Sequence, residues 1–223
     1  TSIGDYTFGD CISLTELIIP LTVTTIGSFL FCRCKSLKRI VIPSSVIEIG
    51  NNAFYECSSL ETVEMHAQLT QIDFNLFYKC ASLCSIVIPP KVTKIGERAF
   101  YGCLALTEVD IPSSVTTIGN ASFERCTDLV RVSISNSVTV IEPYAFSQCS
   151  SLISINIPNS VTSIGNHVFS KCSSLRKIVI PYSVKEMGKN VFQSCISIMQ
   201  VSVPQHLAYN GNPAFKGVTK YVK

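Results

Sequence analysis

Residues 34–56 read CKSLKRIVIPSSVIEIGNNAFYE, and this 23-residue unit returns along the chain. The next copy begins at Cys57 and the one after it at Cys80, with no insertion between them. A fixed period of about 20 to 50 residues is typical of a solenoid, in which each repeat supplies one layer of a continuous core. The sequence therefore predicts a stack of about nine coils, roughly 40 Å long at about 4.8 Å per coil.

Three residue types keep the same phase in every unit. A phenylalanine lies three residues before each cysteine of the series, and a leucine lies three residues after it, with Ile198 in the last unit. The cysteines are Cys11, Cys34, Cys57, Cys80, Cys103, Cys126, Cys149, Cys172 and Cys195. A spacing of three residues is typical of one face of a 3₁₀-like turn. The phenylalanines, from Phe8 to Phe192, are therefore predicted to stack, and Phe215 continues the series.

The rest of the unit predicts strands. Ile40 and Ile42 are β-branched and alternate with period two, which indicates a short strand, and Pro43 ends it because proline cannot donate to a ladder. Residues 46–49 have a spacing of three, which suggests a bent second strand or an extended arc that turns at Gly50. The expected fold is a repeat solenoid of short parallel β-strands and 3₁₀ or short helical turns, with little regular α-helix.

The composition excludes several classes of protein. Of the 223 residues, 47% are hydrophobic and 15% are charged, against roughly 25% charged in an average globular chain. This balance is unlike that of a disordered chain. No apolar run approaches the roughly 18 residues of a membrane-spanning helix, so we expect no membrane insertion within this chain. A net charge of +3 is too small to predict a nucleic-acid partner.

These residues carry a resemblance to a known family. The segment from Leu37 to Pro43 resembles a leucine-rich repeat strand, and residues 46–57 resemble the BspA-type (Treponema-like) subclass of that repeat. The resemblance implies a right-handed arc with the Ile-x-Ile sheet on its concave side. It also implies a role in protein binding, because this subclass occurs in surface antigens of anaerobic bacteria and protozoan parasites that adhere to host proteins. It brings no catalytic residue and no cofactor.

Some units depart from the pattern. His66 and Ser135 replace the strand-ending proline, while Asp73 and Glu142 replace the turn glycine, and we interpret these as tolerated surface changes.

The end of the chain loses the repeat pattern. Asn210 stands in place of an isoleucine and Val218 in place of a cysteine, close to Tyr221 and three lysines, Lys216, Lys220 and Lys223. We therefore expect a single leucine-rich-repeat domain over 1–223, with 204–223 as a degenerate capping repeat. The chain opens in mid-pattern at Thr1, which suggests further coils upstream.

The eleven cysteines admit two interpretations. A disulfide framework is one. We favour a reduced, buried ladder, because stacked Cβ atoms lie farther apart than the roughly 3.8 Å that a disulfide prefers and because cysteine suits a small buried slot. Cys32 and Cys84 fall outside the ladder and are expected to be exposed and more reactive. A linear ladder has no tetrahedral grouping, so we predict no zinc site.

Catalytic residues are not evident. The three histidines, His66, His167 and His206, lie at unrelated phases in distant coils, and no Ser/His/Asp or Cys/His arrangement can be assembled from them. The sequence has no glycine-rich phosphate loop. We therefore expect no enzyme activity, no cofactor and no metal.

The strands predict an interaction surface. Residues on either side of the central strand residue should point outward, and we call these side chains the outward strip. The pairs are Glu16/Ile18, Arg39/Val41, Thr62/Glu64, Ser85/Val87, Glu108/Asp110, Arg131/Ser133, Ser154/Asn156, Lys177/Val179 and Gln200/Ser202. Charges of both signs favour protein recognition over nucleic acid. The candidate partner-binding residues are Arg39, Glu64, Glu108, Asp110, Arg131, Asn156 and Lys177, with Glu108, Asp110 and Arg131 in one central patch.

Two functions agree with this pattern. The first is a surface-displayed or extracellular protein-binding module for adhesion or host interaction, which rests on the family resemblance. The second is an intracellular, cytoplasmic scaffold or adaptor, because oxidising compartments usually pair cysteines into disulfides. Residues 120–122 (Asn-Ala-Ser) form an N-glycosylation motif, which weakly favours the first function.

Overall fold

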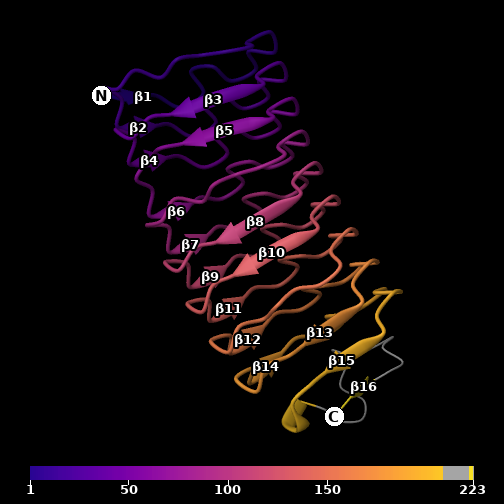
Figure 1. The fold of residues 1–223 in the computed structure, drawn as a ribbon. Coiled ribbons are helices and arrows are strands. Elements are labelled where there is room, and N and C mark those ends of the chain that lie inside the picture. The colour runs from indigo at the N-terminus through magenta and orange to yellow at the C-terminus, as the bar shows by residue number, and fades with distance from the viewer. Residues whose placement is uncertain (208–220, 223) are drawn as a thin grey trace.

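The computed structural model describes residues 1–207 and, by their backbone alone, residues 221–222. The chain winds into a stack of parallel coils, with the N-terminus at one end of the stack and the C-terminus at the other (Figure 1). The solenoid predicted from the repeat period is therefore confirmed. Asn210, Phe215 and Val218, with the lysines at 216, 220 and 223, lie outside the described residues.

One set of strands carries the outward strip. The alternating isoleucines and valines form short parallel strands, and each residue pairs with its equivalent in the next repeat, as Arg39 pairs with Thr62. In Figure 1 these are the longer arrows. They are β3 (Arg39–Ile42), β5 (Thr62–Met65), β8 (Glu108–Ile111), β10 (Arg131–Ile134), β13 (Lys177–Val179) and β15 (Gln200–Ser202). The coils of Ser85 and Ser154 join this face only through isolated bridges.

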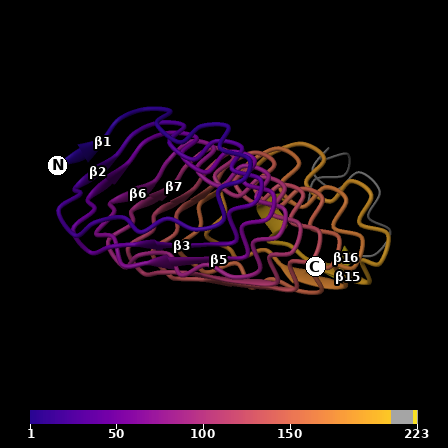
Figure 2. The same ribbon diagram turned by 90° about the horizontal axis from the view of Figure 1, so that it is seen from above.

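The bent second strand is also present. Residues such as Glu48 and Ile49 form two-residue strands in parallel sheets, on a different side of the coil from β3 and β5 (Figure 2). Gly50 follows at a close approach of two coils, since a Cβ there would lie 2.5 Å from the backbone nitrogen of Ser28. The strands are β1 (Ser2–Ile3), β2 (Thr25–Ile26), β4 (Glu48–Ile49), β6 (Gln71–Ile72), β7 (Lys94–Ile95), β9 (Thr117–Ile118), β11 (Val140–Ile141), β12 (Ser163–Ile164) and β14 (Glu186–Met187).

The Phe-x-x-Cys-x-x-Leu segment forms consecutive turns. The amide of Cys57 donates to the carbonyl of Phe54, and that of Leu60 donates to Cys57, as expected for a spacing of three. Left-handed residues such as Glu56 (φ 56°) interrupt this run and turn their amides toward the next coil. The segment therefore forms a series of β-turns. Among residues 1–207, the one 3₁₀ helix is η1 (Gln205–Leu207), and no helix is long and apolar enough to span a bilayer.

The core is a continuous column of stacked rings. Neighbouring phenylalanines from Phe8 to Phe192 lie nearly parallel, with ring centroids between 5.1 and 6.0 Å apart. Phe123 lies 5.1 Å from Phe100 and 5.4 Å from Phe146, which confirms its predicted place between them. Leucines, valines and isoleucines of the same phases fill the space around this column. Each coil therefore repeats the packing of the last.

The cysteine ladder explains how the turn carbonyls are satisfied. Each buried thiol of the ladder donates a hydrogen bond to the carbonyl of the phenylalanine that lies three residues before the previous cysteine. The Cys126 thiol, for example, donates to the carbonyl of Phe100 at 3.2 Å. That same carbonyl already accepts the amide of Cys103. All eleven cysteines are free, in agreement with the reduced ladder. Burial raises the pKa of these thiols, to about 12 for Cys34 and Cys195, and at Cys57 a hydrogen bond with Cys80 raises it more than burial does, so they remain protonated donors at neutral pH.

Two of the irregular units have bonds that the regular ones lack. Glu142 accepts the amide of Asn120 at 2.8 Å, and the hydroxyl of Ser135 donates to the carbonyl of Pro112 at 2.9 Å. Both bonds join neighbouring coils, so these two substitutions add contacts along the stack.

The last described strand shifts its register. β16 (Tyr221–Val222) pairs in parallel with β15, and Val201 faces Tyr221, which is less than one full repeat away along the chain. The capping role of 204–223 stays a prediction.

Candidate functional site

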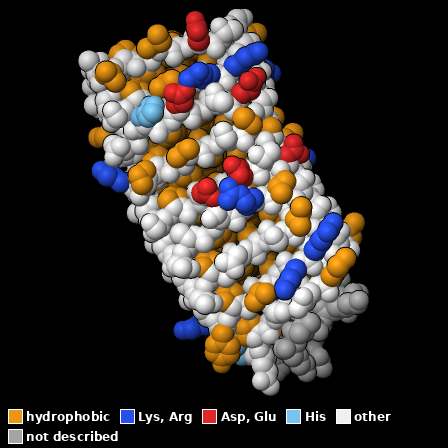
Figure 3. Space-filling view, in the orientation of Figure 1, with side chains coloured by type: hydrophobic (Ala, Val, Ile, Leu, Met, Phe, Trp, Pro, Cys, Tyr) orange, Lys and Arg blue, Asp and Glu red, His pale blue; other side chains and the backbone are white. Residues whose placement is uncertain are grey.

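The outward strip is built by strand alternation. In β3, β8 and β10 the first and third residues are exposed, while the second and fourth enter the core. Because each strand residue pairs with its equivalent in the next repeat, side chains of one phase stand beside each other on neighbouring coils. Figure 3 shows this face, where charged side chains form separate groups among apolar ones.

The central group joins the three residues predicted to share a patch. Arg131 donates from Nε and Nη2 to one oxygen of Glu108, at 3.2 and 2.8 Å. Its Nη1 lies 3.6 Å from Asp110. The bond with Glu108 raises the pKa of the Arg131 guanidinium. The group holds two acids and one base, which is a formal net charge of −1. Both acids stay exposed, at 58% for Glu108 and 71% for Asp110.

A second group lies nearer the N-terminus. Arg39 forms an ion pair with Glu64 on the next coil, and the imidazole of His66 lies 3.9 Å from the same carboxylate. The remaining candidates are apart: Asn156 and Lys177 are exposed on neighbouring coils, and Lys177 has no ion pair among residues 1–207. The seven predicted residues therefore form two ion-paired groups and two separate side chains.

Apolar side chains flank the central group. Val87, 74% exposed, lies one coil from Glu108, and together with Asp110 and Pro112 these residues line a shallow hollow of about 300 Å³. Ile18 is 90% exposed on the same face. In the sequence, this part of the site is indicated by β-branched residues at outward strand positions. The seven candidate residues did not include them.

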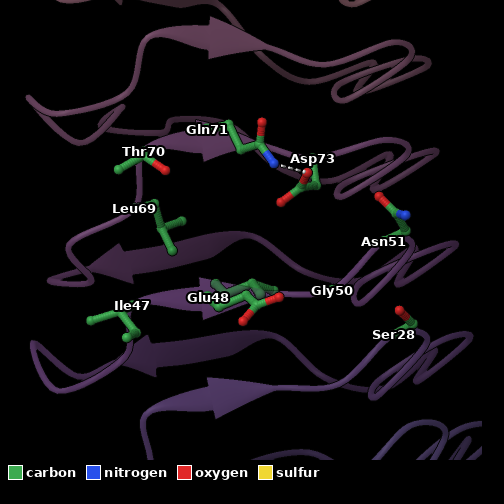
Figure 4. Close-up of a pocket in the computed structure, with 10 residues that line it drawn as sticks. Ser28, Ile47, Glu48, Gly50, Asn51, Leu69, Thr70, Gln71 and Asp73 are labelled. Atoms are coloured by element: carbon green, nitrogen blue, oxygen red, sulfur yellow. Dashed lines mark hydrogen bonds between the residues drawn. The ribbon is translucent and has the colours of Figure 1, made fainter.

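A second hollow lies on the side of the two-residue strands. It holds about 420 Å³ and is lined by Ser28, Glu48, Gln71 and Asp73, among others (Figure 4). Gln71 donates to Asp73 at 2.8 Å. Burial, and to a lesser degree the charge of Glu48, raises the pKa of the Asp73 carboxyl. Ca²⁺ takes about six to eight oxygen ligands, so two carboxylates do not make a site for it. In the described residues no group of three or more His, Cys, Asp or Glu side chains could hold a metal ion.

The two cysteines outside the ladder behave differently. Cys84 is exposed, as predicted. The prediction for Cys32 is wrong, because it is only 3% exposed and burial raises its pKa. Its phase holds Tyr55 in the next coil, and Tyr6 of the preceding coil lies close enough to interact with the Cys32 thiol. Cys11, in the first coil of the ladder, is exposed instead.

The fold and the strip define a leucine-rich repeat protein, with stacked parallel coils and a strand face that carries the variable side chains. A sequence model described as "BspA type Leucine rich repeat region (6 copies)" matches residues 1–130 and 93–222, and the chain belongs to this family. Leucine-rich repeat proteins of this kind are typically non-catalytic interaction modules. No curated protein matches the sequence.

Solved structures agree with the fold. The leucine-rich repeat protein of T. pallidum is 36% identical over 60% of this chain and 59% of its own, with a TM-score of 0.51. A leucine-rich repeat protein from Eubacterium ventriosum is 25% identical over 94% of this chain and 71% of its own, with a TM-score of 0.54. The pneumococcal vaccine antigen PcpA is 20% identical over 92% of this chain and 61% of its own, with a TM-score of 0.59.

Proposed function

We propose that this chain is a non-catalytic, surface-displayed module that binds another protein through the outward strip. The observation that carries the proposal is the exposed group of Glu108, Asp110 and Arg131 beside the apolar hollow at Val87. Exposed ion pairs contribute only about 0–1 kcal/mol to stability, so folding does not require these charges. Charges of both signs beside apolar surface suit a protein partner.

Family membership supports surface display, because BspA-type repeats resemble those of surface antigens that adhere to host proteins. The reduced thiols are the support for the intracellular alternative, but most of the ladder is buried, so it is shielded from oxidants and is compatible with surface display. The experiment must distinguish surface display from the alternative, an intracellular scaffold.

The experiment uses the immobilised chain and two protein fractions from host cells, one of surface proteins and one of cytosol. We expect a partner to be retained from the surface fraction. The double variant Glu108→Lys/Asp110→Lys should weaken its binding at least tenfold, about 1.4 kcal/mol, without unfolding the chain. Retention of partners from the cytosolic fraction alone would refute surface display.

The matched control reverses a charge pair elsewhere. Glu97 and Arg98 are exposed and lie 3.3 Å apart, away from the strip. Glu97→Lys/Arg98→Glu should bind the partner like the wild type. If this control loses binding while the strip variant keeps it, the strip is not the binding surface.

A further inference from the structure

A stack of tyrosines borders the coils at their turns. Tyr55, Tyr78 and Tyr101 follow the phenylalanine of three consecutive units. Their ring centroids are 4.8 Å apart at both steps, and the rings are within 8° of parallel. We call this surface the tyrosine edge. The two neighbouring rings cover both faces of Tyr78.

A cleft opens beside the tyrosine edge. It holds about 530 Å³ and is lined in part by Tyr101, Leu104 and three cations, Lys35, Lys79 and Arg125. Leu104 is 42% exposed and gives the cleft an apolar floor. The cleft therefore combines positive charge with apolar surface, away from the outward strip.

One of the three cations in the cleft is paired with an acid of the same lining, Glu56, and the other two have no ion pair among residues 1–207. Lys79 forms an ion pair with Glu56 at 3.2 Å and lies 5.3 Å from the ring centroid of Tyr78. A hydrogen bond with Tyr101 raises the pKa of Arg125. Neither Lys35 nor Arg125 has an ion pair among residues 1–207. The cleft therefore keeps two uncompensated positive charges.

One further acid lies near the cleft. Glu124 is half-buried and accepts a hydrogen bond from Gln148 at 3.1 Å. Burial raises the pKa of the Glu124 carboxyl. Glu124 lies outside the cleft lining, and its charge acts on Arg125 without an ion pair between them.

The spacing of the cations sets the shape of a ligand. Lys79 and Arg125 share one phase and are two coils apart, and the rings beside them rise 4.8 Å per coil. Because parallel strands of neighbouring coils are about 4.8 Å apart, the two backbones are separated by about 10 Å. A peptide in the polyproline II conformation has three residues per turn and rises about 3.1 Å per residue, so side chains three residues apart lie on one face and about 9 Å apart.

We propose that the cleft at the tyrosine edge binds an acidic segment of a partner protein in the polyproline II conformation, with carboxylates three residues apart. Arg125 binds one carboxylate, the Lys79 ammonium binds the next with a donor left free by its bond to Glu56, and Leu104 contacts a side chain between them. A peptide suits the cleft better than an anionic glycan, because the exposed Leu104 offers an apolar contact that a peptide side chain can fill. This site is independent of the outward strip.

The test measures the fluorescence anisotropy of a labelled peptide, Glu-Gly-Leu-Glu-Gly-Leu-Glu, at low salt and at about 0.5 M salt. We expect binding at low salt that weakens at high salt, because salt screens exposed charges. Arg125→Gln should weaken binding at least fivefold. The same peptide with lysine in place of glutamate should not bind.

The control variant is Lys94→Gln, which removes an exposed cation from β7 on the second-strand side. It should change the affinity for the acidic peptide less than twofold. Glu108→Lys/Asp110→Lys should also change that affinity less than twofold, because the cleft is separate from the outward strip. Circular dichroism melting should match the wild type for each variant. Equal losses in Arg125→Gln and Lys94→Gln would overturn the proposal, as would binding of dextran sulfate without binding of the acidic peptide.

Discussion

Replacing Phe123 by alanine tests the continuous core most sharply. The ring is fully buried and stacks on Phe100 and Phe146 at 5.1 and 5.4 Å. A buried aromatic side chain removes about 150–250 Å² from water, and truncation of such a residue costs about 3–5 kcal/mol. Loss of two ring stacks, each worth about 0.5–1.5 kcal/mol, places the change near the upper end. We expect Phe123→Ala to lower the free energy of unfolding by about 4–5 kcal/mol.

The matched variant is Phe8→Ala, in the first coil. Phe8 is only partly buried and stacks on Phe31 alone in the described chain, at 5.7 Å. In the chain of residues 1–223 its loss should be less than half that of Phe123→Ala, because there its ring has one stacked neighbour instead of two. Urea unfolding followed by circular dichroism measures both variants. Equal losses, or a loss below about 1 kcal/mol at Phe123, would refute the stacked core.

Two other predictions concern titratable groups. Thiol titration in denaturant without reductant should find close to all eleven cysteines as free thiols, and recovery of three or fewer would favour disulfides. In the native protein Cys11 and Cys84 should react fast and Cys32 slowly. Burial raises the pKa of the Asp73 carboxyl above its ordinary 3.8, so the charged carboxylate destabilises the folded state. The free energy of unfolding should therefore increase as the pH falls through that raised pKa toward 3.8 and Asp73 becomes protonated. Urea unfolding midpoints of the wild type and of Asp73→Asn are compared between pH 7 and pH 4. We expect the increase in stability at lower pH to be absent from the variant; the same pH dependence in both proteins would contradict the role given to Asp73.

The constant period of the repeat made most of the fold predictable. Because every coil repeats the same contacts, the spacing of Phe54, Cys57 and Leu60 predicts three columns of the core at once. The same regularity predicts which side chains meet, since Arg131 and Glu108 differ by one period. Repeat proteins permit this because each unit contacts its neighbours alone.

Other features depend on geometry that the pattern does not contain. The burial of Cys32 depends on its neighbours in space, among them Tyr6, and its phase does not indicate it, so the sequence prediction was wrong there. The tyrosine edge recurs with the period at Tyr55, Tyr78 and Tyr101, which was a signal in the sequence. Its basic cleft depends on left-handed residues such as Lys79 and Arg125, at φ 54° and 63°, which turn side chains of different coils toward one hollow.

The central claim, that the strand face binds the partner, is tested most directly by photo-crosslinking. Ser133 in β10 and Thr116, next to β9, are both exposed, and β10 and β9 belong to different parallel sheets. The photoreactive residue p-benzoylphenylalanine is placed at each position in turn, with the partner retained from the surface fraction. We expect a covalent adduct from position 133 and little from position 116. An adduct from position 116 with none from position 133 would contradict the claim.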